Sequence, residues 1–252
     1  MTYPRIENLP LQVNASSWSW SKTEDGDFWI GRELDGTRWL VKGRGSFYAL
    51  RERASAYLLQ TLGVNSQSSA FIILSEESLP VADKPEIERY QLAIHYIDEH
   101  GRNCVDGEKC PLRKLNEQFK DAPKKVSFLE TCSIKNAIDW VKSEVLVCLC
   151  GANEPSDRLI SKDHIMYIID NEQMFSTKPS NPITDTDWFQ TEYDTTMGLT
   201  LDLCKRLSDI DKRDIQVFTT IPEGYVVDEL WSIPKLMEST VRFAKQFLKE
   251  YA

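Results

Sequence analysis

The chain has 252 residues, of which 41% are hydrophobic and 27% are charged, the balance of a soluble globular protein that can bury a substantial core. Its formal net charge of -9 repels phosphate backbones, so we do not expect nucleic acid as a partner. Because no apolar run approaches the ~20 residues that a membrane helix needs, and because the N-terminus lacks the charged start and apolar stretch of a secretory signal, we expect a cytoplasmic protein without stable membrane association.

A hairpin is predicted early in the chain. Strand-like runs at residues 28–34 and 37–42 flank Asp35-Gly36, a pair that supplies the positive φ angles of a two-residue type I′ turn. This arrangement places Lys42 at the end of a strand.

A helix and two more strands are predicted next. Residues 50–64 carry apolar side chains at helical spacing and include Gly63, a natural stop, which predicts an amphipathic helix. The runs at residues 69–74 and 90–97 are strand-like. The first part of the chain is therefore predicted to be mostly strand with one helix.

The remainder of the chain is predicted to be mostly helical. After a polar, turn-rich stretch, residues 136–150 are typical of a buried helix, and further helical runs begin near residues 193 and 229. We therefore expect an α+β protein with two lobes, a small strand-rich one at residues 1–97 and a larger helical one at residues 98–252.

Two acids lie near a strand-like run in the helical part. Asp170 follows the hydrophobic residues 165–169, where a buried strand reaches the surface, and Asp157 lies one hairpin upstream. Carboxylates in such places can hold the Mg²⁺ that bridges phosphate oxygens. The alternative for Asp170 is a turn-forming Asp-Asn pair after a core strand.

Groups that can bind phosphate are available in the strand-rich part. Lys42 can contact the α- and β-phosphates of ATP, and Glu52, in the predicted helix, can hold the ammonium group by charge pairing. Arg44 lies between Gly43 and Gly45, and glycine lets backbone amides approach an anion closely. The alternatives are a solvated lysine at a strand end, an exposed helical glutamate, and a simple turn at the glycines.

Several of these segments resemble the HipA-like kinases and their relatives, the phosphatidylinositol 3/4-kinase-like proteins. The resemblance is carried by WLVKGRG with the helix after it, by LVCLCGANEPSDRLI, by MYIIDNEQMF, and by the later IQVFTTIPEGYVVDELW. It covers roughly residues 28–75 and 140–245. It implies a protein-kinase-like fold and an ATP- and Mg²⁺-dependent kinase, with Lys42 as the phosphate lysine and Asp170 as a metal ligand.

The resemblance also implies roles for residues between the buried helix and the strand-like run. The family pattern has an aspartate that accepts the proton of the substrate hydroxyl, a basic residue beside it, and an asparagine a few positions later that supplies an oxygen to metal. Asp157 and Arg158 fit the first pair, but Lys162 stands five positions later. In another alignment Glu154 lies near the base position and Asp157 is a metal ligand, with Asn153 as a further one. Both alignments stay open.

The acceptor implied by the resemblance is a serine or threonine of a partner protein in the HipA branch and an inositol lipid in the other. The shortened loop and the missing asparagine leave a nucleotide-binding pseudokinase, or an interaction module, as the main alternative. Trp18, Trp20 and Trp188 are candidate interface anchors, and burial in the core is their other interpretation. A lipid kinase is less expected, because an acidic chain without a polybasic segment has little attraction for anionic headgroups.

Overall fold

The structure is a computed structural model of the chain, and it describes residues 12–23, 28–42, 48–74, 92–97, 122–153, 157–161, 163–169, 171–184, 193–223, 225 and 232–252. For residues 42, 122–125, 157 and 193–195 it describes the backbone alone.

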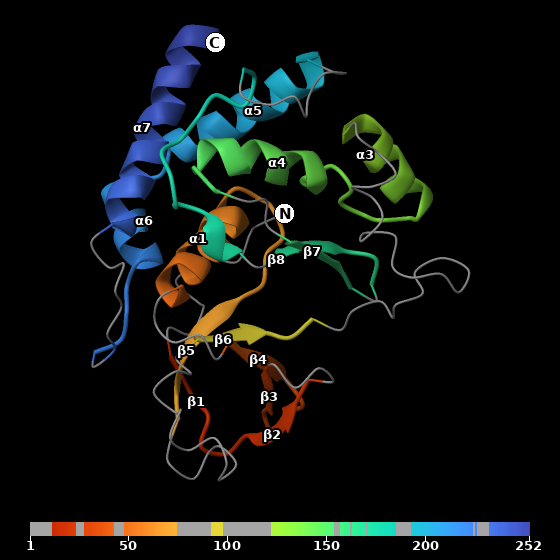
Figure 1. The fold of residues 1–252 in the computed structure, drawn as a ribbon, viewed down its shortest axis with the longest axis vertical. Coiled ribbons are helices and arrows are strands. Elements are labelled where there is room, and N and C mark those ends of the chain that lie inside the picture. The colour runs from red at the N-terminus through yellow and green to blue at the C-terminus, as the bar shows by residue number, and fades with distance from the viewer. Residues whose placement is uncertain are drawn as a thin grey trace.

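Six strands form one sheet in the first part of the chain, as Figure 1 shows at its lower end. The order across the sheet is β1-β5-β6-β4-β3-β2, and neighbouring strands are antiparallel except β1 and β5, which are parallel. The strands predicted near residues 69–74 and 90–97 are confirmed as β5 and β6. The strands are β1 Gln12–Asn14, β2 Ser19–Lys22, β3 Trp29–Arg32, β4 Arg38–Lys42, β5 Ser69–Ile73 and β6 Leu92–His95.

The hairpin between β3 and β4 is confirmed, but its predicted two-residue turn is wrong. The Glu33 N–H donates to the Thr37 carbonyl over 2.8 Å, and the Gly36 N–H donates to the Glu33 carbonyl over 3.0 Å, which encloses a three-residue loop. Within this loop the positive φ angle belongs to Gly36, at 92°, and not to Asp35. The Asp35 carboxylate instead accepts a hydrogen bond from the Thr37 N–H over 2.8 Å, which the longer loop permits.

Tryptophans fill one face of the sheet. The rings of Trp18 and Trp39 are stacked with their centroids 6.0 Å apart, and both side chains are buried. The interpretation of Trp18 as a core residue is therefore confirmed, whereas Trp20 is partly buried against the same cluster. Trp188 lies outside the described residues.

The predicted helix after the hairpin is confirmed as α1, Ala49–Thr61, which ends before Gly63 with its positive φ of 75°. An amphipathic helix should have one side in solvent, and this part of the prediction is wrong, because every residue from 49 to 59 is buried. The apolar side chains of α1 lie in the main core of the helical part, where Leu58 packs in one cluster with Leu207 and Phe247. The division of the chain into lobes at residues 97 and 98 stays a prediction, and α1 connects the sheet with the helices.

The second part of the chain is helical, as predicted, and its longest helices α5 and α7 pack against each other. The buried helix expected at residues 136–150 is confirmed as α4. An α+β fold with a strand-rich first lobe and a helical second lobe is thus confirmed. The elements are α3 Ala122–Thr131, α4 Asp139–Leu149, β7 Asp157–Ile160, β8 Met166–Ile169, the short 3₁₀ helix η3 Asn171–Gln173, α5 Tyr193–Ser208, α6 Lys212–Phe218 and α7 Ile233–Tyr251.

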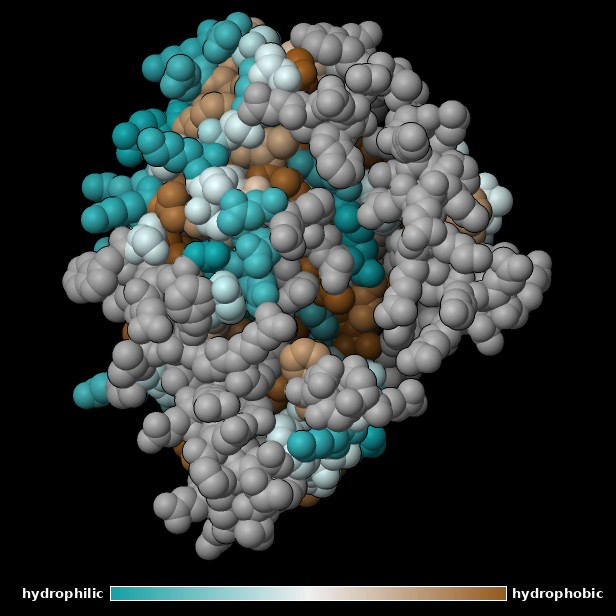
Figure 2. Space-filling view, in the orientation of Figure 1, coloured by the Kyte–Doolittle hydropathy of each residue, from teal (hydrophilic) through white to brown (hydrophobic). Residues whose placement is uncertain are grey.

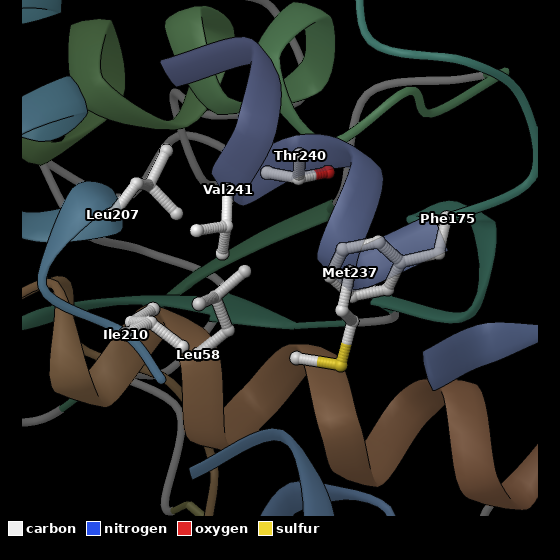
Figure 3. A pocket seen from close by; sticks show the side chains of 7 residues that line it. All are labelled: Leu58, Phe175, Leu207, Ile210, Met237, Thr240 and Val241. Carbon is white, nitrogen blue, oxygen red and sulfur yellow. The ribbon is translucent and has the colours of Figure 1, made fainter. Parts of the chain in front are cut away.

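The last helix, α7, has one face in the core and one in solvent. Ile233, Met237, Ala244 and Phe247 are buried, and hydrophilic side chains gather along the α7 edge of the molecule in Figure 2. Figure 3 shows where this helix meets α1 and α5: Met237 points toward Phe175 and Leu58. The depression there holds no water-sized space, so it is packed core and not a ligand site. No helix among the described residues is long and apolar enough to cross a membrane.

Candidate functional site

The first predicted metal acid, Asp157, begins β7, and β8 ends at Ile169, the residue before the second predicted acid. The strands are antiparallel, and their register pairs the backbone of Asp157 with that of Ile169. Directly opposed Cα atoms in such a ladder are about 4.5–5.5 Å apart. Asp170 is the next residue after Ile169, so the chain reaches it immediately beyond the pair. The hairpin that the sequence predicted between these acids is therefore confirmed, and Asp170 itself lies outside the described residues.

The predicted phosphate-binding residues are described in part. Lys42 ends β4, as predicted, and its backbone pairs with Leu92 of β6. Gly43, Arg44 and Gly45 lie outside the described residues, and so does Glu154. Their predicted roles, like those of Lys42 and Asp157, stay predictions.

Asn153 lies between α4 and the hairpin and is exposed. Its backbone N–H donates to the Ser176 hydroxyl over 3.1 Å, which ties this loop to the segment after η3. An exposed side-chain amide oxygen together with carboxylates is the type of ligand that Mg²⁺ prefers. The donor set predicted from the sequence therefore suits this ion, although the described residues contain no group of three metal-ligating side chains.

Glu52 is buried in the first turn of α1, with 3% of its surface exposed. The alternative of an exposed helical glutamate is wrong. A carboxylate that is withdrawn from water needs charge pairing or hydrogen bonds to offset its desolvation. Burial of Glu52 agrees with its predicted role as partner of an ammonium group, and it does not by itself identify that partner.

The beginning of α1 contacts the segment that follows Asp170. The Arg51 guanidinium donates to the carbonyl of Glu172 in η3 over 3.2 Å, and both side chains are buried. The start of α1 is thereby held against η3, which begins one residue after Asp170. This contact joins residues that are 121 positions apart.

The loop after α1 is hydrogen-bonded to β8. The Ile168 N–H donates to the Asn65 carbonyl over 2.8 Å, and the Ser66 hydroxyl donates to the Ile168 carbonyl over 3.0 Å. Asn171 completes the arrangement, because its Nδ2 donates to Ser66 Oγ over 3.1 Å. No local sequence pattern predicts these contacts, because their partners are more than 100 residues apart.

Arg158, the residue after Asp157, is held on α4. Its Nη2 donates to Glu144 over 2.5 Å and to the Ser143 hydroxyl over 3.0 Å. Its guanidinium also lies 4.0 Å from the centre of the Trp140 ring. Arg158 therefore anchors β7 to a helix of the second lobe, and sequence analysis missed this structural role.

The other end of β8 is fixed by Asn136. Its Nδ2 donates to the Met166 carbonyl and its Oδ1 accepts from the Met166 N–H, each over 2.8 Å. Asp139 at the start of α4 holds the same amide through a bond of 2.9 Å. Together with Ser66, this side chain fixes the backbone of β8 at both of its ends.

A cavity of about 270 Å³ lies between the sheet and the β7–β8 turn. It is slightly smaller than the ~300–1,000 Å³ typical of small-molecule sites. The cavity adjoins Arg38, which begins β4, whereas Lys42 lies at the other end of that strand. It also adjoins the turn between β7 and β8, whereas Asp157 lies at the end of the hairpin away from this turn. It is therefore separate from the predicted phosphate and metal residues. Its lining is formed by Gly36, Thr37, Arg38, His95, Tyr96, Ile97, Ser161, Asp163 and Tyr167.

Burial shifts the pKa of two groups in this cavity. It lowers the pKa of His95, an effect that the nearby Glu33 carboxylate opposes. It raises the pKa of Tyr167, in the same direction as the negative charge of Asp163. Both shifts favour the neutral side chains at neutral pH.

No protein-family model and no curated protein matches the chain. Among solved structures, the chain is similar to the proinflammatory kinase CtkA of Helicobacter pylori, with 10% identity and a TM-score of 0.47 over 93% of this chain and 94% of that one. It is also similar to an aminoglycoside phosphotransferase of Alicyclobacillus acidocaldarius, with 11% identity and a TM-score of 0.29 over 93% and 92% of the two chains. At such identities and TM-scores, neither likeness assigns an activity or a substrate.

Proposed function

We propose that the chain is an ATP- and Mg²⁺-dependent phosphotransferase with a protein-kinase-like fold, of the kind that its HipA-like motifs imply. The observation that carries the proposal is the register of the β7–β8 hairpin, in which Asp157 opposes the residue that precedes Asp170. Mg²⁺–nucleotide sites commonly take one or two carboxylates from the protein, because Mg²⁺ keeps waters and takes other ligands from phosphate, so these two acids would suffice.

The strand-rich lobe supplies the phosphate-binding side of the proposed site. Lys42 at the end of β4 contacts the α- and β-phosphates, and the buried Glu52 of α1 orients its ammonium group. Gly43, Arg44 and Gly45 follow Lys42 directly and cover the phosphates. The contact between Arg51 and Glu172 supports this assignment, since it ties the start of α1 to the segment next to Asp170.

The proposed reaction moves the γ-phosphoryl group of ATP to a hydroxyl of a protein. The hydroxyl oxygen attacks the γ-phosphorus, the bond to the bridging oxygen breaks, and ADP leaves with that electron pair. Asp157 or Glu154 accepts the hydroxyl proton. Asp170 and Asn153 would hold Mg²⁺, joined by Asp157 in the alternative in which Glu154 is the base, and the ion would neutralise charge on the phosphate oxygens.

A nucleotide-binding pseudokinase is the second candidate. The contacts of Arg158 favour it. Its guanidinium is paired with Glu144 and lies over the Trp140 ring, so it does not serve as the basic residue that the kinase pattern has beside the catalytic aspartate. Lys162 in place of an asparagine points the same way. A lipid kinase of the phosphatidylinositol 3/4-kinase-like type ranks below both, because the net charge of -9 opposes anionic membranes.

Transfer of label from γ-³²P-ATP to the protein itself and to lysate proteins, with and without Mg²⁺, tests the proposal. We expect Mg²⁺-dependent labelling by the wild type, its loss in Asp170→Ala, and much weaker labelling in Lys42→Ala. Asp209→Ala and Lys245→Ala are the matched controls, since both residues are exposed and lie outside the proposed site. They should label like the wild type.

The outcomes separate the candidates. A wild type that binds ATP with Mg²⁺ but gives no labelled band is a pseudokinase. A wild type that neither binds nor hydrolyses nucleotide with any divalent metal overturns the whole proposal. Co-flotation with liposomes that contain inositol lipids would instead favour the lipid kinase.

A further inference from the structure

Ser66 hydrogen-bonds to two residues on either side of Asp170 in the sequence, Ile168 and Asn171. Its hydroxyl has one proton, which it donates to the Ile168 carbonyl over 3.0 Å. The same oxygen accepts a hydrogen bond from Asn171 Nδ2 over 3.1 Å. One hydroxyl thus connects the backbone two residues before Asp170 with the side chain one residue after it.

Burial protects the hydrogen bonds of Ser66 from exchange with water. Ser66 is 6% exposed and Asn171 is 1% exposed, so water does not readily replace either bond. The Ile168 N–H is bonded as well, to the Asn65 carbonyl over 2.8 Å, so both backbone groups of Ile168 are held by the loop after α1.

A third attachment lies just beyond Asn171. The Arg51 guanidinium donates to the Glu172 carbonyl, which holds η3 against the first turn of α1. The chain is thereby fixed at residues 168, 171 and 172, and all three attachments come from α1 or from the loop that follows it. These attachments tie the backbone at Ile168 and in η3 to the first half of the sequence.

We propose that Ser66 is a positioning residue for the metal site, because its hydroxyl bonds both to the Ile168 carbonyl before Asp170 and to the Asn171 side chain after it. This inference rests on the proposed function, since it assumes that Asp170 binds the metal. Residues that orient a metal ligand without touching the metal commonly change metal affinity by about 10- to 100-fold when they are removed. Ser66→Ala should therefore weaken metal binding, although residue 66 is 104 positions away from residue 170.

Binding of Mn²⁺ in place of Mg²⁺, followed by electron paramagnetic resonance in the presence of a non-hydrolysable ATP analogue, tests this directly. We expect Ser66→Ala to bind Mn²⁺ about 10-fold more weakly than the wild type. Ser66→Thr, which keeps the hydroxyl, should restore most of the affinity. Thr200→Val is the control, because it removes a buried hydroxyl that bonds within α5, to the Thr196 carbonyl over 2.8 Å.

Amide hydrogen exchange supplies a second measurement that requires no metal. Peptides that cover residues 168–174 should exchange faster in Ser66→Ala than in the wild type, while Thr200→Val leaves them unchanged. If Ser66 positions the metal site, Ser66→Ala should show both weaker Mn²⁺ binding and faster amide exchange at a temperature where each variant is folded.

The outcomes distinguish this inference from the proposed function. A wild type that binds Mn²⁺ with nucleotide, beside a Ser66→Ala variant with equal affinity, overturns the positioning role and leaves the function intact. The same holds if Ser66→Ala and Thr200→Val weaken Mn²⁺ binding equally. A wild type that binds no Mn²⁺ with nucleotide overturns the function and this inference together.

Discussion

The guanidinium of Arg158 and the carboxylate of Glu144 form an ion pair of 2.5 Å inside the protein, with 6% and 9% of their side chains exposed. The Ser143 hydroxyl and the Trp140 ring complete the surroundings of Arg158. Because β7 begins at Asp157, this pair fixes the start of that strand on α4. The ion pair therefore has a structural role, and it lies next in sequence to Asp157, which we propose as a base or metal ligand.

Glu144→Ala should therefore destabilise the protein strongly. Removal of one partner leaves the other charge buried and uncompensated, at a cost of about 3–5 kcal/mol in the free energy of unfolding. Equilibrium denaturation with urea measures this change. Asp202→Ala, which breaks the exposed pair with Arg206, is the control and should cost about 0–1 kcal/mol. Similar losses in both variants would contradict a special role for the buried pair.

Local patterns predicted the elements well where they depend on neighbours in the sequence. The spacing of Leu50, Ala54 and Tyr57 predicts α1, and the short hydrophobic run before Asp170 predicts β8, because side-chain periodicity follows backbone geometry. The type of turn at Asp35-Gly36 was wrong, since two- and three-residue loops use similar residues and differ in which of them has positive φ.

The burial of α1 and the contacts between distant segments could not be predicted from the sequence. The spacing of apolar residues predicts an amphipathic α1, yet Arg51, Glu52 and Arg53 are all buried, because α1 packs against η3 and the sheet as well as against the helical core. The hydrogen bonds of Ser66 with β8 and of Arg51 with η3 depend on how distant segments pack. They follow from tertiary structure and not from any motif.

Gly31→Ala should destabilise the sheet. A Cβ atom at this position would lie 2.2 Å from a ring carbon of Trp18, which is itself stacked on Trp39. Forcing an extra methyl group into a packed cluster typically costs about 1–3 kcal/mol. Thermal unfolding followed by tryptophan fluorescence should show a lower Tm and an altered emission maximum.

Gly198→Ala is the matched control for that substitution. Gly198 lies inside α5, and a Cβ atom there meets nothing within 4 Å. Alanine in a helix interior is favoured over glycine by about 0.5–1 kcal/mol, so this variant should unfold at a higher temperature than the wild type. Opposite signs for the two substitutions are expected, and equal signs would contradict the packing described for Trp18.

The stability of the protein should depend on pH through His95. Burial holds the pKa of its imidazole below the ordinary value of 6.5, so between these two pKa values the unfolded chain binds more protons than the folded protein. The free energy of unfolding therefore rises with pH through this window, and the contribution is lost as the pH falls from 6.5 toward the lowered pKa. Urea denaturation of the wild type and of His95→Gln at several pH values measures the difference.

His95→Gln should reduce the pH dependence of the wild type in this window. A pH dependence that survives in His95→Gln would assign it to other groups.

Glu52→Gln tests the proposed charge pair with Lys42 at nearly constant shape. The amide keeps the size of the carboxylate but removes its charge, and a hydrogen bond to a charged group contributes about 1.5–3 kcal/mol. If Glu52 orients the ammonium group in the transition state, kcat/KM for ATP should fall about 10- to 100-fold. Urea denaturation of the same variant shows whether it is folded where the rates are measured.

Combining Glu52→Gln with Lys42→Ala should cause no further loss, because the pair acts as a unit. A double variant in which the two losses multiply would separate Glu52 from Lys42 and leave its burial as a feature of the fold alone.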